Sequence, residues 1–349
     1  MTQTNAVFDE SLMKMLMGYS ACHIIHAANE LGIPELLVGG PRSLDQLVAE
    51  SGGHGPSIAR LLRAMTALGL FKVDSDGGYS LTPFGDRLWL DASTPRPWEL
   101  LLEGASFRAW EGLTEHLRDG RAAFEHVHGA RFYDHYAKHP KGAKVVDAWM
   151  ARSAEQWLKS FARSYDFAGV GTVVDVGGGQ GRLIAEILQA NPAMQGVLVD
   201  LPHVVAGAPA VLAEAGVAER CTVVGGNAFE SVPQDAEVYL LSRVLFNWSD
   251  ERAIALLSSC RRAMRTGTKL VIIDGILPKE GGGPGAALWD LFLAVQFGAQ
   301  LRTEDEFRRL LAAAGFEHTR TALLETGLSA VNPESRFYTI EAVATGAGN

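Results

Sequence analysis

The chain has 349 residues, 47% of them apolar, so it can bury at least one full core, and length alone favours about two domains. The formal net charge of −9 argues against a nucleic-acid partner, because phosphate binding depends on clustered Lys and Arg. No apolar run reaches the roughly 18 residues that a membrane span needs. The opening segment "MTQTNAVFDE" lacks the basic and apolar regions of a signal peptide. These features predict a cytoplasmic globular protein without a membrane partner.

Cysteine and histidine patterns give no sign of a disulfide framework or a metal site. Cys22, Cys221 and Cys260 are odd in number, scattered and without metal-ligand spacing. His126 and His128 stand close together in "HVH", but no third ligand stands at matching spacing. We therefore expect reduced thiols and no metal.

Residues 1–100 show three helical patterns and then a short hairpin turning at Gly77 and Gly78, as in a winged helix. This segment has 7 basic and 11 acidic side chains, and its recognition-helix candidate "SIARLLRAMTALGLF" carries only Arg60 and Arg63. A winged-helix regulator is therefore disfavoured. The stretch "LMKMLMGYSACHIIHAANELGI" is apolar over most of its circumference. We expect a homodimer built mainly through residues 1–100.

Residues 101–165 are helical and rich in aromatic side chains, with no Pro/Gly/Ser linker before them. We interpret this segment as a connector that contributes to a substrate pocket. Its aromatic residues either line a pocket for a flat ligand or belong to the core: Phe107, Trp110, Phe124, Tyr133, Trp149 and Trp157.

Residues 166–349 alternate short apolar runs with helical stretches, which is typical of a parallel sheet covered on both faces. The predicted fold class is α/β, doubly wound. Two late strands, near "FEHTRTALLE" and "FYTIEAVAT", are expected to pair antiparallel at the end of the sheet. The run "AEVYLLSRVL" predicts a strand that presents Phe246 and Asn247 at its carboxyl end, where α/β enzymes place their chemistry.

The first strand of this half leads into "DVGGGQGR", a glycine loop that lets the backbone approach a ligand at the start of a helix. Arg182 stands where the dinucleotide fingerprint requires Gly, so the sequence disfavours a nicotinamide cofactor. Asp200 ends the next strand, where a carboxylate can accept ribose hydroxyls or act as a turn residue. Together the loop and the acid favour a nucleoside cofactor.

The segments "VVDVGGGQGRLIAEILQANP", "VLVDLPHVV", "GGNAFESVP", "VYLLSRVLFNWSDE" and "ALWDLFLAVQFGAQLRTEDEFRRLLAAAGF" occur in order across the chain. With the winged-helix start, they resemble the dimeric small-molecule methyltransferases that use S-adenosylmethionine, the caffeate and hydroxyindole O-methyltransferase type. Within this family, the segment "YLLSR" is similar to the corresponding segment of the bacterial phenazine N-methyltransferase. The resemblance implies a Rossmann-like catalytic domain, an N-terminal dimerisation domain and S-adenosylmethionine as cofactor.

The resemblance also implies site residues. Asn227 departs from the family's usual Asp, and Ser242 stands where Lys is frequent. The expected cofactor-binding residues are Asp175, Gly177, Gly178, Gly179, Asp200, Leu201, Asn227, Ala228, Phe229, Ser242 and Arg243. The expected substrate pocket comprises Phe107, Trp110, Met150, Trp157, Phe246, Asn247, Trp289, Asp290 and Leu293.

Phe246 stands where family members that methylate a phenol carry the histidine base, and Leu301 stands where a Glu often orients it. Glu341 matches a third family acid or is a structural residue. Asp290 is the best remaining acid, as a substrate-orienting group, a weak base or a capping residue. Catalysis is therefore expected to depend on positioning.

Three functions remain open at this point. The first is methyl transfer to a ring nitrogen or acidic hydroxyl of an aromatic or heteroaromatic natural-product scaffold. The second keeps the fold and cofactor but performs a hydroxylation or a pericyclic rearrangement. The third is a non-catalytic winged-helix regulator. The sequence does not choose between nitrogen, oxygen and carbon as the acceptor atom.

Overall fold

The computed structural model describes residues 10–89, 100–101, 103–279, 284–324 and 337–346, without the side chains of 10, 87–89, 147–156 and 284. They form two compact units, one within residues 1–107 and 139–152 and the other within 108–138 and 153–349. The segment 101–165, expected as a connector, is divided between these units.

The N-terminal unit contains short helices around an apolar core, followed by a hairpin. Its helices include α1 (Glu10–Glu30), α2 (Ile33–Val38), α3 (Leu44–Ser51), α4 (Gly55–Ala67), α5 (Pro83–Trp89) and α7 (Gly104–Arg108). Strands β1 (Phe71–Val73) and β2 (Tyr79–Leu81) pair antiparallel. Gly77 has the positive φ, 81°, that favours glycine in such a turn. The helices and the hairpin expected from the sequence are confirmed.

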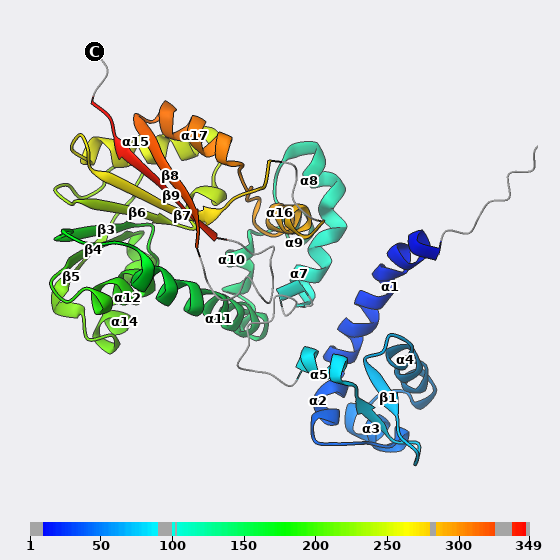
Figure 1. The fold of residues 1–349 in the computed structure, drawn as a ribbon. Helices are drawn as coiled ribbons and strands as arrows, with labels where there is room; N and C mark the ends of the chain where they lie inside the picture. Colours follow the sequence, from blue (N-terminus) through cyan, green and yellow to red (C-terminus); the bar gives the residue numbers. More distant parts are fainter. Residues whose placement is uncertain (1–9, 90–99, 102, 280–283, 325–336, 347–349) are drawn as a thin grey trace, which may run out of the picture. The chain divides into compact units, whose positions relative to one another are not determined.

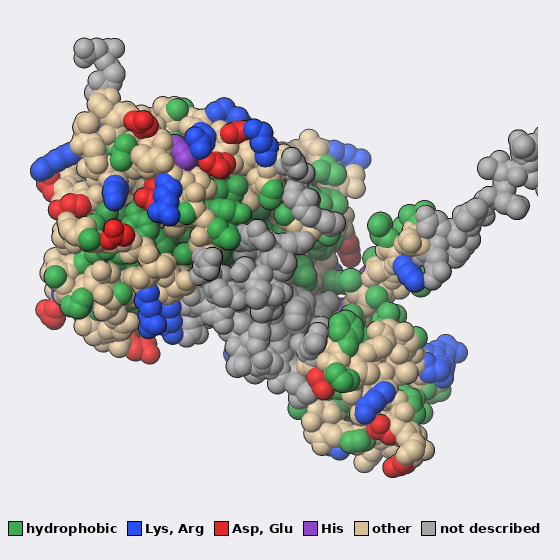
Figure 2. All heavy atoms as spheres, viewed as in Figure 1, with side chains coloured by type: hydrophobic (Ala, Val, Ile, Leu, Met, Phe, Trp, Pro, Cys, Tyr) green, Lys and Arg blue, Asp and Glu red, His purple; other side chains and the backbone are tan. Residues whose placement is uncertain are grey.

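Helix α1 exposes large apolar side chains to solvent. Hydrophobic side chains are visible on the surface of the N-terminal unit in Figure 2. The more than half-exposed ones on α1 are Leu12, Met15, Leu16, Met17 and Tyr19. Because a soluble monomer rarely exposes a continuous apolar patch of this kind, the helix has the surface of a subunit contact.

The second unit contains a seven-stranded sheet in the order β5-β4-β3-β6-β7-β9-β8 within the described residues (Figure 1). The strands are β3 (Thr172–Val176), β4 (Gln195–Asp200), β5 (Cys221–Gly225), β6 (Val238–Ser242), β7 (Lys269–Gly275), β8 (Phe316–Leu323) and β9 (Phe337–Ala344). Strands β3 to β7 pair parallel, whereas β9 pairs antiparallel with β7 and with β8. The predicted parallel sheet and its antiparallel end are confirmed.

Helices cover both faces of this sheet because its strands are apolar on both sides. On one face lie α12 (Arg182–Ala190) and α14 (Ala208–Glu214), and on the other α15 (Asp250–Ala263) and α17 (Glu304–Ala313), as Figure 1 shows. Each face forms its own hydrophobic cluster. The doubly wound α/β arrangement follows.

Strand β6 ends at Ser242, earlier than the apolar run "AEVYLLSRVL" suggests. Arg243 then adopts a left-handed φ of 57°, which few residues other than glycine adopt, and it breaks the extended backbone. A 3₁₀ turn, η3 (Leu245–Asn247), follows. The expectation that the strand itself presents Phe246 and Asn247 is therefore wrong, because both lie on this turn.

Further helices precede the sheet or lie beside it. They are η1 (Ala109–Gly112), α8 (Leu113–Asp119), α9 (Ala123–His128), α10 (Phe132–Tyr136), α11 (Pro140–Ser164), α13 (Pro202–Val205), η2 (Ala218–Arg220) and α16 (Pro284–Phe297). Both η1 and α9 contact α16. Among the residues the structure describes, no helix has the length and apolarity to cross a membrane. Cys22 is exposed, Cys221 partly buried and Cys260 buried, all as free thiols.

Candidate active site

The loop between β3 and α12 is shaped by glycine. Gly177 and Gly179 have positive φ values of 73° and 62°, and the Gly177 N–H donates to the Val199 carbonyl at 2.8 Å. A Cβ on Gly179 would meet nothing within 4 Å, so its backbone faces open space. The loop can therefore bring main-chain groups close to a ligand at the start of α12.

Asp175 lies beneath this loop, completely buried, and neither of its carboxylate oxygens has a hydrogen-bond partner. A Cβ on Gly178 would lie 2.4 Å from Asp175 Oδ2 and 2.6 Å from Leu198 Cδ1, so only glycine fits above the carboxylate. Burial and, to a smaller extent, the negative charge of Asp200 together raise the pKa of Asp175 to about 7. An unpaired buried acid at the base of a glycine loop would be stabilised by a cationic ligand.

Asp200, at the carboxyl end of β4, binds the neighbouring backbone through both oxygens. Its Oδ2 accepts from the Gly179 N–H at 2.8 Å, and its Oδ1 accepts from the Leu201 N–H at 2.7 Å. A carboxylate oxygen has more than one acceptor site, so Asp200 can still accept from ligand hydroxyls. The structure thus brings together Gly177, Gly178, Gly179, Asp200 and Leu201.

Asn227, Ala228 and Phe229 follow β5 at the same edge of the sheet. The Asn227 carbonyl oxygen accepts from the Phe229 N–H at 3.1 Å, and its amide donates to Glu230 at 2.9 Å. The ring of Phe229 meets that of Trp248 edge to face at 5.0 Å. The guanidinium of Arg252 lies 4.0 Å from the Phe229 ring centroid and 5.2 Å from that of Trp248. These contacts form an aromatic wall beyond the loop.

Ser242 ends β6 and Arg243 follows it, next to Asp274 near the end of β7. Burial lowers the pKa of the Arg243 guanidinium, and the charges of Tyr133 and Asp274 oppose that change. Asp274 is 1% exposed, and its carboxylate accepts from the Gly275 N–H at 2.9 Å. Burial raises the pKa of Asp274 to about 7 despite its hydrogen bonds and the nearby arginines. Asp274 was missed from the sequence, although an acid at the end of the run "KLVIID" was a visible signal.

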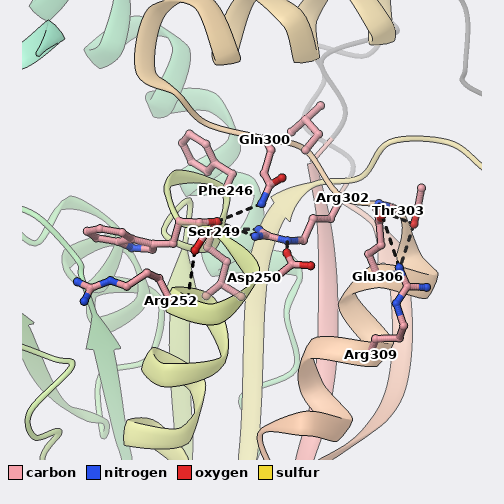
Figure 3. Close-up of polar contacts among 12 residues, drawn as sticks. Phe246, Ser249, Asp250, Arg252, Gln300, Arg302, Thr303, Glu306 and Arg309 are labelled. Carbon is pink, nitrogen blue, oxygen red and sulfur yellow. Dashed lines mark hydrogen bonds and ion pairs between the residues drawn. The ribbon is translucent and has the colours of Figure 1, made fainter. Parts of the chain in front are cut away.

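Phe246 is held through its backbone by strand β7 and by the loop after α16. Its N–H donates to Asp274 Oδ2 at 3.3 Å, and its carbonyl accepts from the Gln300 N–H at 2.9 Å. Figure 3 shows Phe246, Gln300 and Arg302 together at this turn. Asn247 is exposed, and its amide donates to the Arg243 carbonyl at 3.3 Å. These hydrogen bonds therefore fix the backbone of the turn that carries the Phe246 ring.

Asp290 of α16 is half-buried, and its Oδ1 accepts from the Leu301 N–H at 2.7 Å. Burial raises the pKa of this carboxyl, whereas the Leu301 hydrogen bond lowers it. The Leu301 side chain lies against Gly275, whose hypothetical Cβ would be 2.8 Å from Leu301 Cδ2. Asp290 and Leu301 therefore belong to one region with the ends of β7 and η3.

The expected aromatic pocket residues are distributed over both units. Trp289 stacks on Phe292 at 5.0 Å, and Leu293 is buried on the same helix. Trp110 lies on η1, which contacts that helix. Trp157 is 2% exposed, with its indole N–H unpaired and its ring 5.5 Å from Phe337.

Phe107 belongs to the N-terminal unit, where its ring contacts His23 at 4.7 Å and His26 at 4.9 Å. The Met150 side chain lies outside the described residues.

Glu341 lies within β9, opposite Val271, three residues before Asp274 on β7. It accepts from the Tyr165 hydroxyl at 3.4 Å and lies 3.7 Å from Arg320. These contacts give it a structural setting. Across the described part of the chain, no group of three His, Cys, Asp or Glu side chains is placed to hold a metal ion.

Comparison with known proteins identifies the family. Residues 110–317 match the O-methyltransferase domain model, and residues 13–91 match the O-methyltransferase dimerisation domain model. The chain belongs to this methyltransferase family. The dimerisation match agrees with the apolar surface of α1 and supports a homodimer.

The names of two curated relatives state that they methylate phenazines. The phenazine O-methyltransferase of Lysobacter antibioticus is 38% identical over 92% of this chain and 94% of its own length. The phenazine-1-carboxylate N-methyltransferase of Pseudomonas aeruginosa is 30% identical over 90% and 94%. The expected likeness to phenazine methyltransferases is confirmed, and it includes relatives that methylate oxygen and nitrogen.

A solved relative carries the cofactor. The O-methyltransferase from neocarzinostatin biosynthesis, in complex with S-adenosylmethionine and 2-hydroxy-5-methyl naphthoic acid, has a TM-score of 0.77 and 29% identity. The match covers 93% of this chain and 96% of that one. The protein is thus an S-adenosylmethionine-dependent methyltransferase.

Proposed function

We propose that the protein transfers a methyl group to a ring nitrogen or an acidic hydroxyl of an aromatic or heteroaromatic natural-product scaffold, by positioning and without a histidine base. The observation that carries this proposal is Phe246. It replaces the base expected from the family, and its backbone is fixed by Asp274 and Gln300. A phenyl ring cannot accept a proton, but it can pack on a flat acceptor.

The cofactor side is proposed to consist of the glycine loop, Asp200 and the aromatic wall. S-adenosylmethionine supplies an activated methyl group on a positively charged sulfur. Asp200 would bind the ribose, while Gly177 and Gly179 would approach the methionine part through their backbones. The unpaired carboxylate of Asp175 and the open space at Gly179 support a cationic ligand here. The adenine would lie near Asn227, Ala228 and Phe229, with Leu201, Gly178, Ser242 and Arg243 at the border.

Positioning supplies enough of the rate enhancement to replace a base. General-base catalysis is worth about 10²–10⁴ in rate, or roughly 3–5.5 kcal/mol of barrier. Holding two reactants in line is worth about 7–11 kcal/mol. The acceptor must then need no deprotonation in the transition state. A ring nitrogen uses its lone pair, and an acidic phenol has already lost its proton to water.

The acceptor side is proposed to include Phe246, Asn247, Trp289, Asp290 and Leu293. Trp289 and Phe292 stack with an interplanar angle of 21°, which provides aromatic area on α16. The half-buried carboxylate of Asp290 would orient a polar group of the acceptor. Names of the relatives support flat, fused-ring acceptors of the phenazine or naphthoate kind. Those names give no support to hydroxylation or rearrangement.

The proposal is tested with methyl-labelled S-adenosylmethionine and a panel of hydroxyphenazines, phenazine carboxylates and hydroxynaphthoates, analysed by mass spectrometry. We expect a labelled product together with one equivalent of S-adenosylhomocysteine. Matched acceptors whose hydroxyl is replaced by a non-acidic alcohol should not be methylated on that oxygen. Product formation without S-adenosylhomocysteine, or efficient methylation of the alcohols, would overturn the proposal.

A further inference from the structure

We propose that Arg302 is a positioning residue that holds the acceptor side and the cofactor side of the η3 turn together. Arg302 is 2% exposed. Its Nη1 donates to the Leu245 carbonyl at 2.9 Å, its Nη2 to the Trp248 carbonyl at 2.6 Å, and its Nε to Asp250 Oδ1 at 2.9 Å. All three guanidinium nitrogens therefore bind the segment from Leu245 to Asp250 (Figure 3).

The backbone of Arg302 is itself anchored to the sheet. It forms a parallel bridge with Ile276, just after β7, and its carbonyl accepts from the Leu277 N–H at 2.9 Å. Gln300, two residues before Arg302, donates a hydrogen bond from its side-chain amide to the Trp248 carbonyl at 3.3 Å. Arg302 thus connects the short 3₁₀ turn η3 to the chain that leaves the end of β7.

The segment that Arg302 holds carries residues of two different functions. Phe246 lies within it on the proposed acceptor side. Trp248 contacts Phe229 on the proposed cofactor side. A shift of this segment would change the distance between the two walls, and methyl transfer by positioning depends on that distance. The inference therefore rests on the proposed function and adds the residue that sets its geometry.

Lysine cannot replace this arginine. A guanidinium is planar and places several N–H groups in a fixed fork, whereas an ammonium is a point charge with no such spread. Three acceptors on one turn match the fork. Loss of the side chain would also leave the Leu245 and Trp248 carbonyls without these donors in a largely buried place.

Arg220 provides a matched control in the same unit. It donates to the carbonyl of Leu188 in the last turn of α12 at 2.8 Å, and to those of Asn191 at 3.1 Å and Met194 at 3.0 Å just beyond that helix. Arg220→Gln removes a similar set of three bonds but touches no proposed site residue. It reports the effect of lost arginine–carbonyl bonds on stability alone.

The experiment compares Arg302→Gln, Arg302→Lys and Arg220→Gln in the full-length protein. Hydrogen exchange of the free protein is the first measurement. We expect faster exchange in residues 244–251 for both Arg302 variants, and in residues 188–194 only for Arg220→Gln. Unchanged exchange at 244–251 in folded Arg302→Gln would overturn the inference. This measurement needs neither cofactor nor acceptor.

Kinetics and calorimetry form the second measurement. We expect kcat/KM to fall about 10- to 100-fold in Arg302→Gln, the size of effect that a misplacement of about 1 Å produces. S-adenosylmethionine affinity should fall about two- to fivefold, since Trp248 is only one wall of its site. Arg302→Lys should recover little, and methylguanidinium at millimolar concentration should partly rescue Arg302→Ala while ammonium does not.

For Arg220→Gln we expect a lower melting temperature and an unchanged kcat/KM per folded molecule. Equal losses of kcat/KM in Arg302→Gln and Arg220→Gln would mean that Arg302 acts through general stability only. If the wild-type protein methylates no acceptor, the proposed function fails. The exchange and cofactor-affinity results then still decide the role of Arg302.

Discussion

Asp290 Oδ1 accepts a hydrogen bond from the backbone N–H of Leu301 at 2.7 Å. The carboxylate of α16 is thereby fixed beside the residue that stands where the family often carries an orienting acid. Asp290 is thus an acid supplied from another element to the same region. Its raised pKa comes from burial, so the neutral form is favoured more than in water.

We predict that Asp290→Asn folds normally and lowers kcat/KM by less than about tenfold. The Asn carbonyl still accepts from Leu301, and orientation by one neutral hydrogen bond is worth about 1 kcal/mol. Asp290→Ala should lower kcat/KM further, since it also leaves the Leu301 N–H unpaired. Steady-state kinetics and thermal melting measure both effects. A loss of 10³ or more in Asp290→Asn, the range of a lost base, would identify Asp290 as the base.

Phe246→Ala is predicted to weaken acceptor binding more than the chemical step. The lost aromatic packing is worth about 0.5–1.5 kcal/mol beyond the buried area, or roughly 2- to 12-fold in KM. Phe246→His would restore the histidine that is usual in the family. We expect the wild-type protein to be active without it. Single-turnover rates between about pH 6 and 9 should show only the ionisation of the acceptor. An ionisation near pH 7 that disappears in Asp274→Asn or Asp290→Asn would reveal a displaced base.

The buried acids predict an unusual pH dependence of stability. The pKa values of Asp175 and Asp274 are raised from 3.8 to about 7, so the folded state holds their protons more tightly than the unfolded state. The stabilisation of the folded state by these two protonated carboxyls is therefore fully present below about pH 4 and is lost as pH rises to about 7. Each group lowers the free energy of unfolding by about 1.4 kcal/mol per pH unit in that window.

Denaturant unfolding of the cofactor-free protein at several pH values measures this slope. Asp175→Asn, which keeps a similar side-chain shape, should remove the part of the slope that comes from Asp175. Asp274→Asn should remove the part that comes from Asp274. The difference between wild type and each variant isolates the group from all other titrations. Parallel curves for wild type and Asp175→Asn would show that the carboxyl is already ionised well below pH 7.

Asp200→Ala is predicted to weaken S-adenosylmethionine by about 1.5–3 kcal/mol, the magnitude of hydrogen bonds to a charged group. The structure adds a second effect, because Asp200 also accepts from Gly179 and Leu201. Asp200→Asn is the matched control, since its carbonyl can keep one of these backbone bonds. Calorimetry should rank the affinities as wild type, Asp200→Asn, Asp200→Ala. Equal affinities would remove Asp200 from the cofactor site.

The sheet was predictable because parallel strands buried on both faces are continuous apolar runs. Strand β3 has the bounds of "TVVDV", and the run "KLVIID" lies within β7. The end of β6 was not predictable, since the apolar Val244 and Leu245 follow directly while Arg243 turns left-handed. Backbone conformation at one residue decides where Phe246 lies, and composition does not contain that information.

The glycine loop and Asp200 were also predictable, because their spacing follows local chain geometry. The surroundings of Phe246 were not, because its partners come from segments far away along the chain. Asp274 is 28 residues distant in sequence, and Arg302 is 54 residues from Trp248. Only tertiary structure brings an ordinary Asp and an ordinary Arg to this turn.

The three free thiols differ in a way that makes α1 a natural place for a chemical label. Cys22 is exposed on that helix, whereas burial raises the pKa of Cys221 to about 11 and that of Cys260 to about 12. A thiolate is the reactive species, so a maleimide dye at neutral pH should modify Cys22 first. Because α1 has the surface of a subunit contact, a dimer should shield Cys22, and its rate of modification should fall as the protein concentration rises. That dependence on concentration reports dimer formation without any engineered cysteine.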